Sequence, residues 1–258
     1  MLEERIVAFV DILGSREAVK RMEEGDDSKA KVILKALSII RNFAQSASVA
    51  KGPIADVEVS WFSDSIVISA EVLELWRVIH AVGILSSLLC HEGIYTRGGI
   101  ARGLCHHSEG ICFGPGLIAA YDLESKVAVY PRVVIQQRLA DDEDKQDTKK
   151  KLMKIIRLGP ASNFNFRRSE DGLLWVDILS PNLVSYISFG DGHHKNYVDY
   201  MNDVKKALEL KLGKNKDERI NAKVNWFATY FNRCAMEATS EGIKISQIEA
   251  GGVVHWYS

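Results

Sequence analysis

The chain has 258 residues, of which 47% are hydrophobic and 26% are charged, and its 33 Lys and Arg nearly balance its 34 Asp and Glu. This length supports one large domain, or one domain with an appendage, with a sizeable core. Broad, sequence-independent nucleic-acid binding requires a basic surface to displace counterions, so the balanced charge argues against a nucleic-acid partner.

The sequence shows no targeting or membrane signal. The N-terminal stretch MLEERIVAFV is acidic before its apolar run, unlike a signal peptide, and we expect no apolar run long enough to span a membrane. The four cysteines include no CxxC pair, a usage typical of reduced thiols. We therefore expect a cytoplasmic protein with no membrane partner.

The first half of the chain alternates between predicted strands and helices. A β-rich run ends before Gly14, and Ser15 suits the N-cap of a following helix. Pro115 suits the first turn of a later helix. Residue type and apolar spacing predict a strand over 4–11, helices over 27–49 and 71–91, a hairpin over 54–70, a hairpin turning near 108–110, and a strand over 130–136. This order is typical of an α+β sandwich.

The second half has a different character. Residues 137–158 form a charged run, which predicts a solvated helix or loop. A hairpin is expected over 162–178, followed by long helices over about 196–212 and 216–240. We expect a core domain over 1–140 and a C-terminal extension over 141–258, whose hairpin and long helices pack on the core.

Two acids interrupt apolar strand-like segments. Asp11 ends the run RIVAFVDILG, and Asp64 lies within SWFSDSIVISA. Each could be a simple turn residue. If both strands share a sheet, however, the two carboxylates meet at one edge and repel each other unless a cation lies between them. Mg²⁺ or Mn²⁺ held by two carboxylates is common in nucleotide chemistry, and two ions can share such a pair.

The segment DILGS passes directly from a strand to a helix. Its backbone N–H groups and the helix N-terminus could hold phosphate oxygens, and Gly14 permits close approach. No Walker A motif is present. The run GGIARG matches a glycine fingerprint only loosely and lies inside a strand pattern, which argues against a Rossmann fold.

Five segments in order carry a resemblance to a known family: FVDILG, FSDS, RGGIARG, GPGLIAAYDLE and YPR. Across about residues 4–136 they resemble the class III nucleotidyl cyclases, and most closely the compact bacterial pyrimidine cyclases of the Pycsar anti-phage system. The resemblance implies a ferredoxin-like, palm-type sandwich with a helical C-terminal extension. It also implies a homodimer with its active sites at the interface, and two Mn²⁺ or Mg²⁺ ions per site.

The resemblance assigns roles to several residues. The implied metal ligands are Asp11, Asp64 and the backbone carbonyl of Ile12, and the implied phosphate contacts are the backbone of Leu13, Gly14 and Ser15. Ser60 stands where purine cyclases carry a base-reading Lys, and Tyr121 is expected to border the base.

The chain departs from the family on the helix after the glycine turn. Ile118 and Asp122 stand where purine cyclases carry an Asn and an Arg, so the transition-state cation must come from elsewhere. The candidates are Arg97, Arg102 and Arg132. We expect Arg97 to be the catalytic cation and Arg132 to contact the nucleotide, although each could equally form a structural ion pair.

The expected function is therefore metal-dependent conversion of UTP to 3′,5′-cyclic UMP and pyrophosphate, a lyase reaction whose product activates a separate effector in antiviral defence. Cyclic CMP synthesis from CTP and an inactive nucleotide-sensing dimer are the alternatives. A dinucleotide cyclase would need a GGDEF-like turn, which is absent.

Cys105, His106, His107 and Cys112 invite comparison with a zinc site. Their spacing matches no familiar structural site, so we expect surface histidines and buried thiols instead. Trp175 and Trp226 are expected in the core.

Overall fold

The computed structural model describes residues 1–25, 28–47, 56–137, 139, 166–169, 171–188, 196–214 and 217–248. Most of the charged run over 137–158 lies outside them. The elements, in chain order, are β1 (Glu3–Ile12), α1 (Ser15–Glu23), α2 (Ser28–Ala47), β2 (Glu58–Phe62), β3 (Ser65–Glu71), η1 (Val72–Glu74), α3 (Leu75–Cys90), β4 (Thr96–Ser108), β5 (Ile111–Phe113), α4 (Pro115–Lys126), β6 (Val133–Ile135), β7 (Phe166–Arg168), β8 (Leu174–Val176), α7 (Pro181–Ser188), α8 (Tyr197–Glu209) and α9 (Glu218–Ser240).

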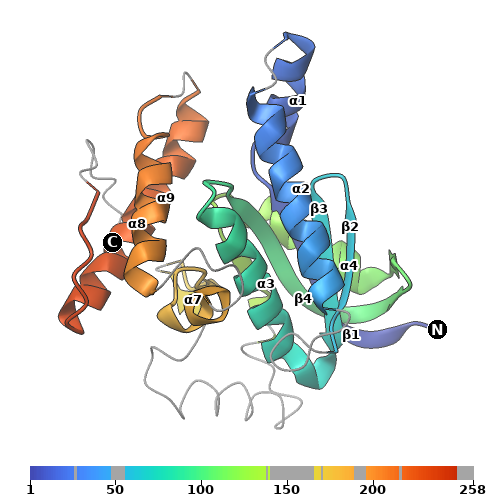
Figure 1. Cartoon of the computed structure of the whole chain (residues 1–258). Coiled ribbons are helices and arrows are strands. Elements are labelled where there is room, and N and C mark those ends of the chain that lie inside the picture. The colour runs from blue at the N-terminus through green and yellow to red at the C-terminus, as the bar shows by residue number, and fades with distance from the viewer. Residues whose placement is uncertain are drawn as a thin grey trace.

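The strands form one sheet in the order β2-β3-β1-β4-β6-β8-β7, with β5 paired to β4. Strands β2, β3, β1 and β4 are antiparallel neighbours. With helices between β1 and β2 and between β3 and β4, this order is the ferredoxin-like β-α-β-β-α-β arrangement. The predicted α+β sandwich is therefore confirmed, with a pair of helices after the first strand (Figure 1).

One face of the sheet carries the main core. Alternate residues of the central strands, such as Ala8, Ile68 and Ile100, are fully buried on the face that meets α2 and α3. Helix α4 packs on the other face, over β4 and β1. Gly99 and Gly103 permit this approach: an added Cβ would lie 2.5 Å from the Ala120 carbonyl oxygen in one case and 2.8 Å from the Gly116 Cα in the other. The glycine run is thus a packing surface on a strand.

The C-terminal extension continues the same sheet. Strand β8 pairs with β6, and the β7–β8 hairpin forms its edge. Helices α8 and α9 lie side by side on one flank of the molecule, with α7 below them in Figure 1. Trp175 and Trp226 are 5% and 4% exposed and pack edge to face, so the prediction that they are core residues is confirmed.

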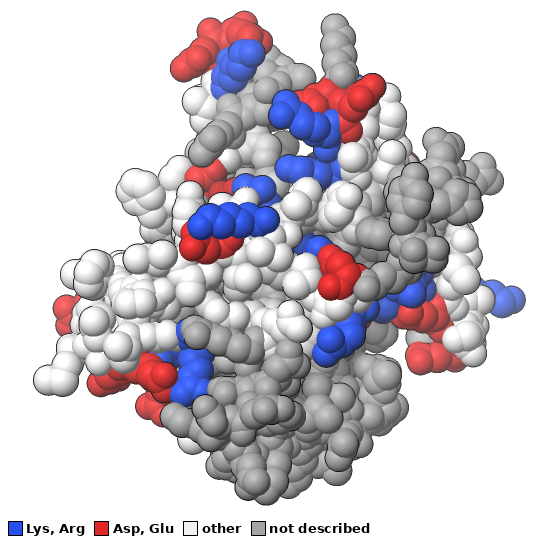
Figure 2. Space-filling view, turned by 180° about the vertical axis from the view of Figure 1, so that it is seen from behind, with Lys and Arg blue, Asp and Glu red and all other residues white. Residues whose placement is uncertain are grey.

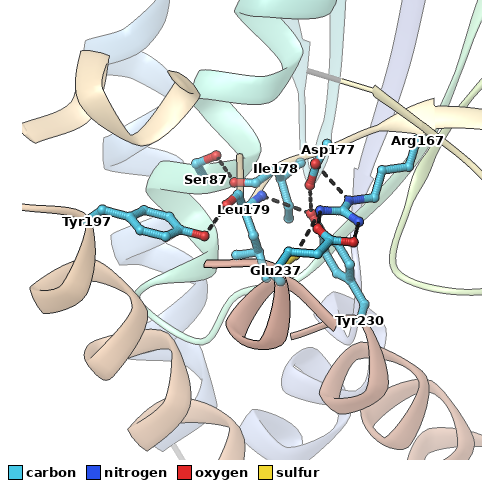
Figure 3. A network of polar contacts seen from close by, with 9 residues as sticks. Ser87, Arg167, Asp177, Ile178, Leu179, Tyr197, Tyr230 and Glu237 are labelled. Carbon is cyan, nitrogen blue, oxygen red and sulfur yellow. Dashed lines mark hydrogen bonds and ion pairs between the residues drawn. The ribbon is translucent and has the colours of Figure 1, made fainter. Parts of the chain in front are cut away.

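A polar network joins β7, β8 and α9 inside the extension (Figure 3). Arg167 contacts Asp177 through Nε at 2.7 Å and Glu237 through Nη2 at 2.6 Å. The Tyr230 hydroxyl donates to the Asp177 carboxylate and accepts from the backbone N–H of Leu179 at 2.9 Å. These contacts anchor α9 to the edge of the sheet.

The surface and the most apolar helix bear on two expectations. On the face in Figure 2, Lys and Arg side chains lie beside Asp and Glu rather than in one basic patch.

Within the described residues, Val72–Cys90 is long and apolar enough to cross a membrane by length and composition, contrary to the sequence-based expectation. Its Val78, Val82 and Leu85 are fully buried in the core of the protein.

Candidate functional site

The two predicted acids lie at the same end of the sheet. Asp11 is opposite Ser65 in the β1–β3 ladder, and Asp64 occupies the turn that leads into β3. The backbone N–H of Ile12 donates to the Asp64 carbonyl at 3.1 Å. The Asp11 side chain is 22% exposed, and the Ser65 Oγ lies 3.5 Å from its Oδ1. Adjacent strand ends therefore bring both carboxylates to one partly desolvated edge.

The turn after β1 is fixed by contacts on both sides. Gly14 has φ +92°, which glycine adopts readily because it has no Cβ. The Ser15 hydroxyl donates to the Asp64 carboxylate. The Leu13 N–H donates to the Tyr95 carbonyl at 2.9 Å. Of the three expected phosphate contacts, Leu13 thus already has its N–H engaged, whereas Gly14 lies exposed at the start of α1.

Arg97 reaches the site from the start of β4, opposite Asp11 in the ladder. Its Nη2 lies 3.9 Å from Asp11 Oδ2, and its Nε lies 2.5 Å from Oε1 of Glu124 on α4. Sequence reasoning missed Glu124, since only the packing of α4 on β4 shows that it meets Arg97.

Besides Arg97, a second cation lies in this region: Lys223 on α9, which sequence reasoning missed. Its pKa is lowered, first by burial and then by the positive charge of Arg97. Lys223 of the extension therefore lies within electrostatic range of Arg97.

The other two arginine candidates lie in different surroundings. Arg102 pairs with Glu4 near the opposite end of β1. Arg132 is 6% exposed, and it donates to Ser169 and to Asp171, each at 2.9 Å, which ties the α4–β6 connection to the β7–β8 hairpin. The structure brings neither into contact with the acids.

The two predicted base contacts lie on the open part of the α4 face. Ser60 is opposite Val67, which is opposite Phe9, so these three side chains form one row across β2, β3 and β1. Tyr121 packs edge to face on Phe9, with ring centroids 5.4 Å apart. The Ser60 Oγ lies 2.7 Å from Nε2 of His107. His107 was expected at the surface, but it is 4% exposed because it lies over β2 and β3, so that prediction was wrong.

Tyr95 connects the turn after β1 to the extension. Its carbonyl accepts from Leu13, and its ring packs on Phe227 of α9, with centroids 4.7 Å apart. The Lys211 ammonium lies 4.6 Å from the same ring. Burial, the largest influence, raises the pKa of Tyr95, so its hydroxyl stays protonated at neutral pH. The extension thus buttresses the turn that follows the first acid.

The donor atoms at this edge suit a hard divalent cation. Asp11, Asp64 and the Ile12 carbonyl offer only oxygen, which Mg²⁺ and Mn²⁺ prefer. In the described part of the chain, no three Asp, Glu, His or Cys residues gather into a metal-binding group. A cation here would therefore rest on the two carboxylates and the carbonyl, with its remaining ligands from water or substrate.

No protein-family profile and no curated protein matches the chain. Among solved structures, the chain is similar to two structures of a bacterial light-regulated adenylyl cyclase. The sequence identities are 13% and 15%, the TM-scores are 0.41 and 0.42, and each match covers 80% of this chain. It spans 56% and 57% of the length of those chains. It is also similar to the adenylyl cyclase CyaB from P. aeruginosa, at 14% identity and a TM-score of 0.42, over 68% of this chain and 94% of that one. The ferredoxin-like assignment rests on the strand order and register of this chain itself.

Proposed function

We propose that the protein is a metal-dependent nucleotidyl cyclase of the class III type, with UTP as its substrate and 3′,5′-cyclic UMP and pyrophosphate as its products. The observation that carries the proposal is the meeting of Asp11 and Asp64 at one sheet edge, beside the turn at Gly14 and the start of α1. The resemblance of the five sequence segments supplies the reaction and the pyrimidine base.

In this proposal the ribose 3′-hydroxyl attacks the α-phosphorus. The new P–O bond forms as the bond to the β-phosphate oxygen breaks, and the hydroxyl proton passes to water. Asp11, Asp64 and the Ile12 carbonyl would hold one or two Mn²⁺ or Mg²⁺ ions, which lower the pKa of a coordinated hydroxyl and offset phosphate charge.

The other residues position the triphosphate and offset its charge. The N–H groups of Gly14 and Ser15 at the start of α1 face the phosphates, where the helix dipole favours negative charge. Arg97 offsets charge that develops during transfer. Ser15 orients Asp64 through its hydrogen bond.

A homodimer belongs to the same proposal. Phe62 is 85% exposed and Ile118 is 62% exposed, and Phe62 projects from the same face of the sheet as Ser60. Such apolar exposure supports a partner subunit over this face. Antiviral defence and a separate effector activated by the product rest on the family resemblance alone, and a cytoplasmic setting rests on the cysteine usage.

The test is an incubation of the purified full-length protein with each of the four nucleoside triphosphates and Mn²⁺. Products would be separated by chromatography and identified by mass, with Asp64→Asn as the control. A cyclic monophosphate made from UTP and lost in Asp64→Asn supports the proposal. A product from CTP or a purine would retain the mechanism and overturn the base. Failure to convert any triphosphate would overturn catalysis and favour the nucleotide-sensing dimer.

A further inference from the structure

A buried chain of hydrogen bonds ends at Ser60. Arg5 Nε donates to the Ser69 Oγ at 2.9 Å, the Ser69 Oγ lies 2.8 Å from Nδ1 of His107, and Nε2 of His107 lies 2.7 Å from the Ser60 Oγ. Ser69 is fully buried and His107 is 4% exposed. The chain thus connects a cation on β1 to a hydroxyl on the open row formed by Ser60, Val67 and Phe9.

The donors and acceptors set a single direction for this chain. Arg5 can only donate, so Ser69 accepts from it, and the buried Ser69 proton then requires an acceptor. Nδ1 of His107 is the acceptor within reach, which requires the ring to be neutral. Burial and then the positive charge of Arg5 lower the pKa of His107 to about 4, so the ring is neutral at pH 7.

The remaining proton of His107 then lies on Nε2, which donates to the Ser60 Oγ. The opposite tautomer would place two donors on Ser69 and leave its own proton buried without an acceptor, which costs free energy. Ser60 therefore receives a hydrogen bond from the protein, and its own proton is directed away from the chain of hydrogen bonds. The hydroxyl can therefore donate toward the open row, where it also keeps one lone pair.

Ser60 is placed to meet a base. It lies on the same face as Phe62, which is opposite Ser65, itself opposite Asp11. Two residues along a strand separate these rows by roughly 7 Å. The half-buried side chains of Val67 and Phe9 provide an apolar surface for a ring beside the hydroxyl, and Tyr121 borders it. A nucleotide with its phosphates at the acids could lay its base along this row.

We propose that His107 is a positioning residue that holds the Ser60 hydroxyl as a hydrogen-bond donor, so that the site selects a pyrimidine base with an oxo group over one with an amino group. This inference rests on the proposed nucleotide-binding function of the site. The uracil O4 accepts the hydrogen bond that Ser60 offers, whereas a cytosine amino group can only donate to the remaining lone pair of the Ser60 Oγ and leaves the Ser60 proton without an acceptor on the base. The preference thus originates in Arg5 and Ser69, two residues that lie behind the base.

The experiment measures binding without turnover. The full-length protein is titrated calorimetrically, in Mn²⁺, with 3′-deoxyuridine triphosphate and 3′-deoxycytidine triphosphate, which lack the attacking hydroxyl. We expect the uridine compound to bind the wild type at least about tenfold more tightly. Ser60→Ala should bring the two dissociation constants within about threefold of each other, mainly by weakening the uridine compound.

Two further variants separate positioning from general damage. Ser69→Ala leaves Ser60 and His107 in place but removes the group that fixes the tautomer, so the preference should fall while triphosphate affinity remains. His107→Gln, which keeps one donor and one acceptor, should retain part of the preference, whereas His107→Leu should lose it. Thermal unfolding of each variant, and the response of its melting temperature to inorganic triphosphate, would identify variants whose fold is damaged.

Three outcomes overturn the inference. Equal affinity of the wild type for both compounds would do so, as would a preference that survives in Ser60→Ala. In either case UTP turnover would leave the proposed function standing. If neither compound binds and no triphosphate is converted, the proposed function fails, and the inference fails with it.

Discussion

The Nε atom of Arg97 lies 2.5 Å from Oε1 of Glu124, whose side chain is 4% exposed, while the other end of the same guanidinium lies 3.9 Å from Asp11. Glu124 therefore holds Arg97 back from an acid that the proposed cation requires. Glu124 on α4 and Asp11 on β1 share the single positive charge of Arg97. Removing the Glu124 carboxylate should therefore strengthen the contact between Arg97 and Asp11.

We expect Glu124→Gln to raise the Mn²⁺ concentration needed for half-maximal activity by several-fold. Without Glu124, Arg97 pairs more closely with Asp11 and competes with the cation. The measurement is a Mn²⁺ titration of the initial rate of UTP conversion at saturating nucleotide. The double variant Glu124→Gln/Arg97→Gln serves as the control, because it should restore the wild-type metal requirement even if its maximal rate is low. A Mn²⁺ requirement that Glu124→Gln leaves unchanged would refute this competition.

Gly14→Ala should weaken triphosphate binding beyond its effect on stability. Gly14 has φ +92° with open space where a Cβ would lie, so the substitution acts through backbone strain of roughly 1–2 kcal/mol. Gly242, after α9, is a matched control with φ +88° and equally open space. Both variants should lose similar stability in urea, but only Gly14→Ala should raise the KM for UTP. An equal effect on KM in the two variants would mean that the turn at Gly14 does not contact the nucleotide.

Acid should destabilise the protein partly through His107. The pKa of His107 is lowered to about 4 in the folded state, against 6.5 when unfolded. The unfolded state therefore binds the proton more readily, so this contribution to stability is fully present above pH 6.5 and is lost as the pH falls from 6.5 toward 4. Its full size is roughly 3 kcal/mol. Urea unfolding at pH 7 and pH 4.5 should show a smaller loss for His107→Gln than for the wild type.

The stability of the extension should depend on Asp177 far more than on Glu237, although both carboxylates contact Arg167. Asp177 is 8% exposed, so Asp177→Ala leaves a partly buried guanidinium without its inner partner and should cost roughly 3 kcal/mol. Glu237 is 51% exposed, and Glu237→Gln should cost less than about 1 kcal/mol. Urea unfolding of the two variants makes the comparison. Similar losses of unfolding free energy in the two variants would mean that the exposed Glu237 contributes as much to holding Arg167 as the buried Asp177 does.

Local patterns predicted the acid pair and most of the fold. Asp11 and Asp64 stand out because an acid is rare beside an apolar strand, and the pairing of β1 with β3 places Asp11 beside the turn that carries Asp64. The turn at Gly14 followed by Ser15 likewise carries its own signal. Apart from the pairing of β1 with β3, these features depend on neighbours in sequence, and the expected ranges lie close to the observed elements.

Features that depend on distant packing could not be predicted in the same way. Nothing near Glu124 in the sequence shows that it meets Arg97, because the contact exists only once α4 lies on the glycines of β4. His107 is separated by 47 residues from Ser60, and strand alternation does not show that it lies over β2 and β3. The length of β4, 13 residues, is what carries the imidazole to that position.

The contact between the Tyr95 carbonyl and the Leu13 N–H has a consequence for how the chain could be divided. The ring of Tyr95 lies against Phe227 of α9 and next to Lys211 in the turn after α8, so these two segments support the turn that follows Asp11. A shortened chain that kept the central strands and both acids would still lack these supporting contacts. An activity that depends on this turn is therefore a property of the sheet and the C-terminal helices together, and the two would have to be inherited as one piece.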